Sequence, residues 1–107
     1  MSIIPKSEIL DLTALAEYQT GAVVSRQVVK AAGGNVTLFA FDEGQELSEH
    51  TAPFDALVHV LDGEAEIKIS GQLYQLKAGE GIIMPANTPH ALLARKQFKM
   101  LLTMINA

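Results

Sequence analysis

The sequence predicts an all-β fold in which short strands close into a barrel or sandwich. From residue 22 onward, short apolar runs alternate with segments that contain Gly, Pro or Asn, the residues that favour tight turns. Residues 64–70 alternate strictly, with Ala65, Ile67 and Ile69 on one face and polar or charged residues on the other. Many short strands at close spacing are typical of barrels and sandwiches, and the density of turn residues argues against a helical bundle.

Each strand is expected on its local pattern. Residues 36–41 carry no charge on either face, which suits a strand that is buried on both sides. Gly71 and Gln72 fit a hairpin turn that joins two strands. The first twenty residues are ambiguous, because 9–12 fits an edge strand and 12–18 a short helical stretch. The full set of expected strands is 22–30, 36–41, 56–61, 64–70, 73–76, 81–84, 90–94 and 98–105.

Composition limits the class of protein. The 107 residues fit one domain, 1–107, and their net charge of −4 argues against a nucleic-acid surface, which needs a clustered basic patch. The absence of cysteine excludes disulfides, thiolate zinc sites and a cysteine nucleophile. No apolar run approaches the length that spans a membrane, and the first residues lack the pattern of a signal peptide. We therefore expect a soluble cytoplasmic protein with no nucleic-acid or membrane partner.

Two spaced motifs in the middle of the chain identify a family resemblance. They read Gly44-x5-His50-x-Ala52-x3-Ala56-x6-Gly63 and Gly79-x5-Pro85-x-Asn87-x2-His90-x3-Ala94. Both resemble the paired signatures of the cupin superfamily, Gly-x5-His-x-His-x3-Glu-x6-Gly and Gly-x5-Pro-x-Gly-x2-His-x3-Asn. The resemblance implies a small jelly-roll barrel, or double-stranded β-helix, with one open mouth. It places the barrel core at about 36–105 and leaves 1–35 as an N-terminal extension.

The resemblance also implies that the metal chemistry of the motif is depleted. Metal-binding cupins use three His and one Glu, and here Ala52 and Ala56 stand where a His and the Glu would be. Positions two apart on a strand share a face, so Ala56, Val58 and Val60 are expected to point together. The resemblance assigns that face to the interior of the barrel. The small side chains would give a roomy apolar pocket, for which we expect the lining residues His50, Ala52, Ala56, Val58, Met84, His90, Ala94 and Met100.

His50 and His90 have three possible roles. They are hydrogen-bonded residues that hold the barrel mouth together, groups that contact a ligand without metal, or ligands of a weak two-histidine metal site. A metal such as Ni, Zn, Fe or Mn would need a further carboxylate, for which Glu46, Glu49 and Asp55 are the nearest candidates. Glu49 and Asp55 lie one residue off the ligand register, so each would need a bulge or slip to reach inward.

Other residues are assigned to packing or to assembly. His59 should face away from the barrel, and Tyr74 is read as a packing residue. The strand 98–105 is apolar on both faces, so its outer face, with Leu57, is expected to be covered by a second copy in a homodimer. A charge at Leu101 should therefore split the dimer. A charge reversal at Glu66, expected on the exposed face of its hairpin, should not.

Several functions remain open at this point, and the fold does not decide among them. The first is binding or sensing of a small, partly apolar molecule without a tightly bound metal. The second is a metal-independent isomerase, as in the sugar-epimerase branch of the fold, with His50 or His90 as catalytic base. That branch needs basic residues near the site, and only Arg95 and Lys96 follow the second motif. A weakly metal-dependent enzyme and a purely structural module are the remaining readings.

Overall fold

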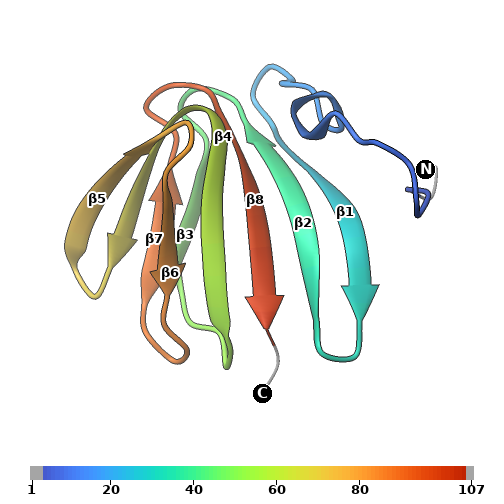
Figure 1. The fold of residues 1–107 in the computed structure, drawn as a ribbon. Helices are drawn as coiled ribbons and strands as arrows, with labels where there is room; N and C mark the ends of the chain where they lie inside the picture. Colours follow the sequence, from blue (N-terminus) through green and yellow to red (C-terminus); the bar gives the residue numbers. More distant parts are fainter. Residues whose placement is uncertain (1–3, 106–107) are drawn as a thin grey trace.

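The predicted all-β fold is confirmed. The computed structural model describes residues 4–105, and within that range no helix is long and apolar enough to cross a membrane. A 3-10 turn precedes eight strands that curl into a barrel of two facing sheets (Figure 1). The elements are η1 (Leu12–Ala14), β1 (Val23–Ala31), β2 (Gly34–Phe41), β3 (Glu46–His50), β4 (Asp55–Ile69), β5 (Gln72–Lys77), β6 (Gly81–Met84), β7 (His90–Leu93) and β8 (Phe98–Ile105).

All strand pairs are antiparallel, and they form a larger and a smaller sheet. The larger sheet has the order β1-β2-β8-β4-β6, and the smaller has the order β3-β7-β4-β5. The long strand β4 belongs to both. Its first half pairs with β8 and β6, and its second half pairs with β5 and β7. In Figure 1 this strand rises through one sheet and arches over into the other.

The continuity of β4 corrects the expectation of two separate strands, 56–61 and 64–70. The chain does not turn back between them but bends at a bulge, between Val60 and Asp62, and at Gly63, whose φ is +73°. A Cβ at Gly63 would meet the Gln97 carbonyl oxygen, so only glycine allows this close approach to the start of β8. Bulges of this kind bend strands at barrel corners, which is how one strand serves two sheets.

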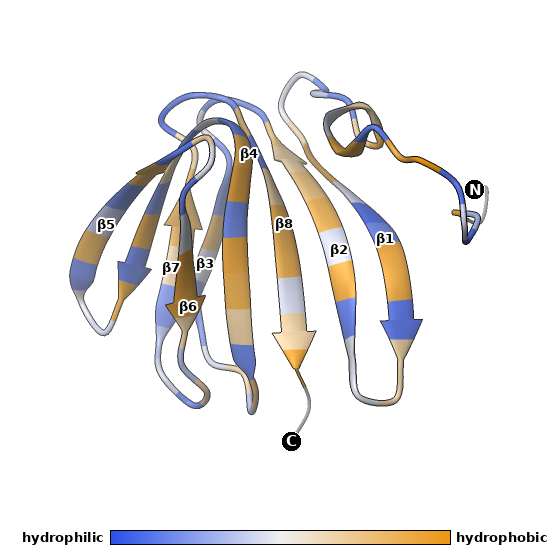
Figure 2. Cartoon of the chain, viewed as in Figure 1, coloured by the Kyte–Doolittle hydropathy of each residue, from blue (hydrophilic) through white to orange (hydrophobic). Residues whose placement is uncertain are grey.

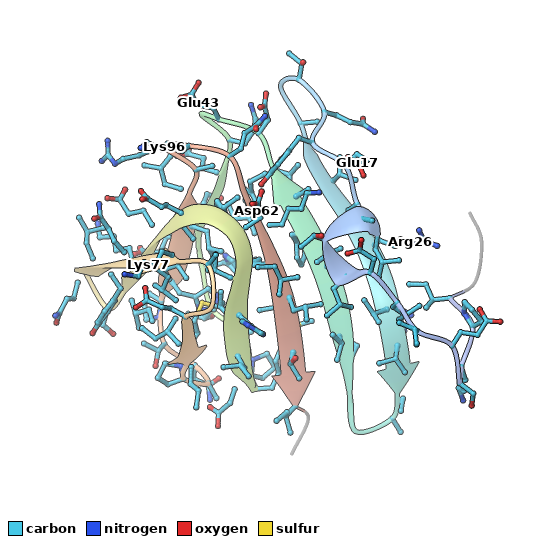
Figure 3. All side chains as sticks on the ribbon, turned by 45° about the horizontal axis from the view of Figure 1, so that its top comes forward. Glu17, Arg26, Glu43, Asp62, Lys77 and Lys96 are labelled. Carbon is cyan, nitrogen blue, oxygen red and sulfur yellow. The ribbon has the colours of Figure 1, made fainter. Side chains whose placement is uncertain are left out.

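The barrel has a closed end and a mouth. At the closed end the rings of Phe41 and Phe98 stack with their centroids 4.5 Å apart and are fully buried. Charged side chains surround this end, among them Glu43, Asp62 and Lys96 (Figure 3). At the opposite end, which we call the mouth, β3 ends and β7 begins.

Side chains that alternate between the two faces of each strand place the apolar residues inside the barrel, where they form the core. Figure 2 shows bands of opposite hydropathy along β4 and β5, while β8 is mostly apolar. The inward residues of β4 are buried on both halves of the strand: Ala56, Val58, Val60, Ala65, Ile67 and Ile69. This confirms the predicted inward register of Ala56, Val58 and Val60.

The N-terminal segment covers part of the outer face of the larger sheet. The expected edge strand at 9–12 does not form, whereas the alternative, a short helical stretch, appears as the single turn η1.

Hydrogen bonds hold this N-terminal segment to the sheet. Lys99 Nζ donates to the Thr13 carbonyl (2.5 Å), and Arg26 Nη1 donates to the Leu15 carbonyl (3.3 Å). The Tyr18 hydroxyl donates to Asp62 (2.5 Å), and burial together with this carboxylate raises the tyrosine pKa. Beneath the segment, Leu38 and Ala40 are fully buried, and Phe41 is buried on the opposite face. The predicted burial of strand 36–41 on both faces therefore holds for its second half, whereas Val36 and Thr37 are partly exposed.

The polar strand β3 was missed by the sequence reasoning. Its residues, Glu46–His50, are exposed except for the partly buried Leu47, and the strand pairs only with β7. A short edge strand with one inward apolar residue has little periodicity to reveal it. The hairpin between β4 and β5 turns through Ser70 and Gly71, both with positive φ, one residue earlier than expected.

Candidate functional site

The mouth of the barrel brings His50 and His90 together. His50 is the last residue of β3 and His90 the first of β7, and they are direct cross-strand partners. Their Nε2 atoms lie 3.1 Å apart, and the rings meet edge to face at 71° with their centroids 4.4 Å apart. Residues forty positions apart in the sequence therefore form one imidazole pair.

Backbone carbonyls hold the other side of each ring. His50 Nδ1 lies 2.8 Å from the Ser48 carbonyl oxygen, and His90 Nδ1 lies 3.1 Å from the Thr88 carbonyl oxygen. A carbonyl oxygen only accepts hydrogen bonds, so each Nδ1 is assigned as the donor. Sequence reasoning missed these two anchors, because any residue can supply a carbonyl and no side-chain pattern marks them.

The loop before β7 positions His90. Asn87 occupies the left-handed region with φ of +58°, and its amide donates to the Ala52 carbonyl at 2.7 Å. Asn tolerates this conformation better than most residues, which confirms that Asn can replace the glycine of the related motif. The same loop thus ties both motifs together at the mouth.

The two histidines differ in burial. His90 is 4% exposed, whereas His50 is open to solvent. Burial lowers the pKa of His90, and the neighbouring His50 acts in the same direction. The hydrogen bond to Thr88 opposes both effects. At neutral pH, these effects favour the neutral form of His90.

The proposed lining residues fall at different depths. Ala56 and Met84 pair across strands β4 and β6 at the mouth end, and Ile69 pairs with His90 there. Ala52 is partly buried beside the Asn87 loop. Ala94 and Met100 are fully buried toward the closed end, and Val58 lies between the two levels. Of the proposed lining residues, Ala56 and Met84 thus lie at the same end of the barrel as the imidazole pair.

The interior is not closed to solvent. Four inward-facing residues pack against the core yet remain partly exposed, which places them along the open part of the barrel: Phe39, Ile82, Leu102 and Met104. Tyr74 is also inward-facing and partly buried, which fits the expected packing role.

The donor set at the mouth does not fit a tightly held metal. Structural and catalytic metal sites generally use three or more protein ligands. Over residues 4–105, no three His, Cys, Asp or Glu side chains are grouped so that they could hold an ion. Asp55 is engaged elsewhere, since its Oδ1 accepts the Ala86 amide at 2.8 Å. Glu46 and Glu49 line a groove on the outer face of the smaller sheet.

Two further residues lie away from the mouth. His59 is exposed on the outer face of the larger sheet, as predicted. Glu66 also faces outward, but it is only 8% exposed and Arg95 Nε donates to it at 3.0 Å. The expectation that Glu66 is an exposed residue is therefore wrong, because the guanidinium of Arg95 and the neighbouring strands cover its carboxylate.

A depression of about 630 Å³ lies at the closed end. Its walls carry charges of both signs, including Glu43, Glu64, Lys77 and Lys96 (Figure 3). These charged side chains are exposed to solvent. The imidazole pair at the mouth remains the candidate site.

Comparisons with known proteins agree with this geometry. A conserved protein of unknown function from Streptococcus pyogenes is 38% identical over 99% of this chain and 93% of its own, with a TM-score of 0.92. A cupin superfamily protein from Desulfitobacterium hafniense is 28% identical over 99% of this chain and 97% of its own, with a TM-score of 0.91. A Streptomyces cyaneus protein named polyketide synthase CurC is 30% identical over 63 residues, which span 58% of this chain and 41% of that protein. The family model described as the cupin domain matches residues 37–106. The chain therefore belongs to the cupin domain family.

Proposed function

We propose that this cupin binds a compact, partly apolar small molecule in the mouth of its barrel without a tightly bound metal. The observation that carries the proposal is the His50–His90 pair, whose Nε2 atoms face each other at 3.1 Å. No third metal ligand accompanies the pair within residues 4–105. Small-molecule sites in proteins combine an apolar lining with a few convergent polar groups, and the position of Ala56 and Met84 at the same end as the imidazole pair supports the proposal on that ground.

Methyl NMR of methionine-labelled protein tests this proposal. Met84 and Met104 lie near the mouth, whereas Met100 is fully buried toward the closed end and serves as an internal reference. A library of small apolar fragments should contain members that shift the Met84 and Met104 signals saturably and leave Met100 nearly unchanged. A library that shifts none of these signals would contradict the proposal.

A metal-free enzyme is the second candidate, and the environment of His90 favours it. A general base must be unprotonated at the working pH, and the lowered pKa of His90 secures that state. The role would be abstraction of a proton from a bound substrate, as expected for an isomerase or epimerase. The discriminating result is turnover that is lost in His90→Gln while ligand binding is retained.

We also propose that the chain forms a homodimer through the outer face of its larger sheet. Part of that face is covered by the N-terminal segment, but the rest exposes an apolar patch. The patch is Val29, Leu57, Ile83 and Ile105, with exposed fractions of 48%, 41%, 62% and 60%. Of these, Val29, Leu57 and Ile83 belong to one row across β1, β2, β8, β4 and β6, completed by Val36 and Thr103.

A second copy is the natural cover for such a surface. Monomers seldom expose contiguous apolar patches, and a two-fold dimer buries the same patch on both subunits. The N-terminal segment can add to the contact. It projects beyond β1, and its Ile9 side chain is fully exposed at 101% of the reference area (Figure 1).

Leu101, which the sequence suggested as the position for a charge that splits the dimer, is a poor probe of the proposed interface. Leu101 packs against the N-terminal segment of its own chain, together with Leu38 and Ala40. A charge there would disturb the fold as well as any dimer, so Leu57 is the better position.

A further inference from the structure

The tautomers of the two histidines are determined by their anchors. Each Nδ1 faces a carbonyl oxygen, Ser48 O for His50 and Thr88 O for His90, and on these two contacts we assign the hydrogen of each ring to Nδ1. A neutral imidazole has only one N–H. The Nε2 atom of each neutral ring is therefore a hydrogen-bond acceptor.

Two acceptors then converge on one point. The Nε2 atoms are 3.1 Å apart, which is hydrogen-bond distance, yet with both tautomers assigned in this way neither atom has a hydrogen to donate. His90 is buried, so water does not readily satisfy its lone pair. The pair is complete only when a hydrogen from a third group is shared between the two nitrogens.

A bound proton is one way to supply that hydrogen, but the site opposes it. Burial of His90 disfavours its protonated form, and so does the neighbouring ring. An ammonium group would bring a full charge into an apolar mouth, where Ala56 and Met84 are each only 3% exposed. A neutral hydroxyl group brings a donor without that cost.

We propose that His50 and His90 act together as a double hydrogen-bond acceptor that selects ligands by an acidic hydroxyl, as found in a phenol or an enol. This inference rests on the proposed small-molecule function and names the class of ligand. The hydroxyl approaches the pair from one side and donates a bifurcated hydrogen bond to both Nε2 atoms, and the apolar body of the ligand points away from the pair toward the apolar side chains at the mouth. No bond other than hydrogen bonds is formed or broken on binding.

A pair of probes that differ only in the donor tests the inference. Phenol and anisole share an aromatic ring, but methylation removes the donor hydrogen from anisole. With histidine-labelled protein, the ring ¹⁵N shifts report the tautomers, and titration gives the two affinities. We expect hydrogen on Nδ1 of both rings, and phenol binding about tenfold more tightly than anisole, a ratio that corresponds to one hydrogen bond.

The variant His50→Phe provides the matched control. His50 is exposed, so an aromatic replacement keeps a ring at the site while removing one acceptor. In this variant His90 Nε2 still accepts, so the preference for phenol over anisole should fall without vanishing, and anisole binding should change little.

Two outcomes would overturn the inference, and they are distinguishable from each other. Equal affinities for phenol and anisole, or rings that carry their hydrogen on Nε2, would reject the acceptor pair and leave the small-molecule function standing. If neither probe shifts the Met84 or Met104 methyl signals, the proposed function fails and the inference fails with it.

Discussion

Arg95 donates through Nε to Glu66 at 3.0 Å, and the two side chains differ sharply in exposure, at 67% and 9%. The exposed cation thus covers a buried carboxylate on the outer face of the smaller sheet. Arg95→Ala leaves that carboxylate without its partner, so the free energy of unfolding should fall by about 1–3 kcal/mol. Urea denaturation measures the change.

The neighbouring Lys96 supplies the control for this prediction. Lys96→Ala also removes an exposed cation from the same loop, and its effect should stay within about 0.5 kcal/mol. Equal effects of the two substitutions would show that net charge, and not the contact with Glu66, stabilises this region.

The stability of the protein should depend on pH through His90. Because its pKa is lowered in the folded state, the unfolded chain binds more protons as the pH drops below about 6.5. The stability that His90 contributes is therefore fully present above that pH. It is lost progressively as the pH falls toward the lowered pKa of His90 in the folded protein. Denaturation curves between pH 7 and 5 should show a stability that falls with pH, and a shallower fall in His90→Gln. An unchanged slope in the variant would assign the dependence to other groups.

The proposed dimer predicts different effects of two leucine substitutions. Leu57 lies in the apolar patch of the larger sheet, whereas Leu73, which is 58% exposed, lies on the outer face of the smaller sheet. Leu57→Glu should convert a dimer to a monomer in sedimentation at micromolar concentration, and Leu73→Glu should leave it intact. A wild-type protein that sediments as a monomer would contradict the dimer itself.

Restoring the missing ligand residues should create a metal site. Ala52→His with Ala56→Glu would add two donors near His50 and His90, giving the four ligands of metal-binding members. The double variant should bind Mn, Fe or Ni far more tightly than the parent in calorimetry. Ala52→His with Ala56→Gln matches it in volume but lacks the carboxylate, and should bind more weakly. No gain in a folded double variant would show that these side chains do not reach the histidines.

Much of the fold could be predicted from local patterns. The strand 98–105 was predicted with its observed bounds, since apolar residues cover both of its faces. In β4, alternation places Ala56, Val58 and Val60 on one face, and the family resemblance assigns that face to the interior. The continuity of β4 through Gly63 could not be predicted, because a bulge followed by a glycine bend has the same sequence pattern as a turn between two strands.

The site was predictable in part. Motif spacing singled out His50 and His90, and the structure makes them cross-strand partners. Their tautomers could not be predicted, because these depend on two backbone carbonyls. The burial of Glu66 could not be predicted from the sequence either. Its strand alternates in the usual way, and the residue that covers it, Arg95, is 29 positions away.

Elemental analysis of the purified protein after chelation and dialysis tests the central claim most directly. The claim is that the mouth holds a histidine pair and no resident metal, because two imidazoles are too few ligands to retain an ion. We predict well under one equivalent of any divalent metal per chain. One tightly retained equivalent that disappears in His50→Ala and in His90→Ala would contradict the account.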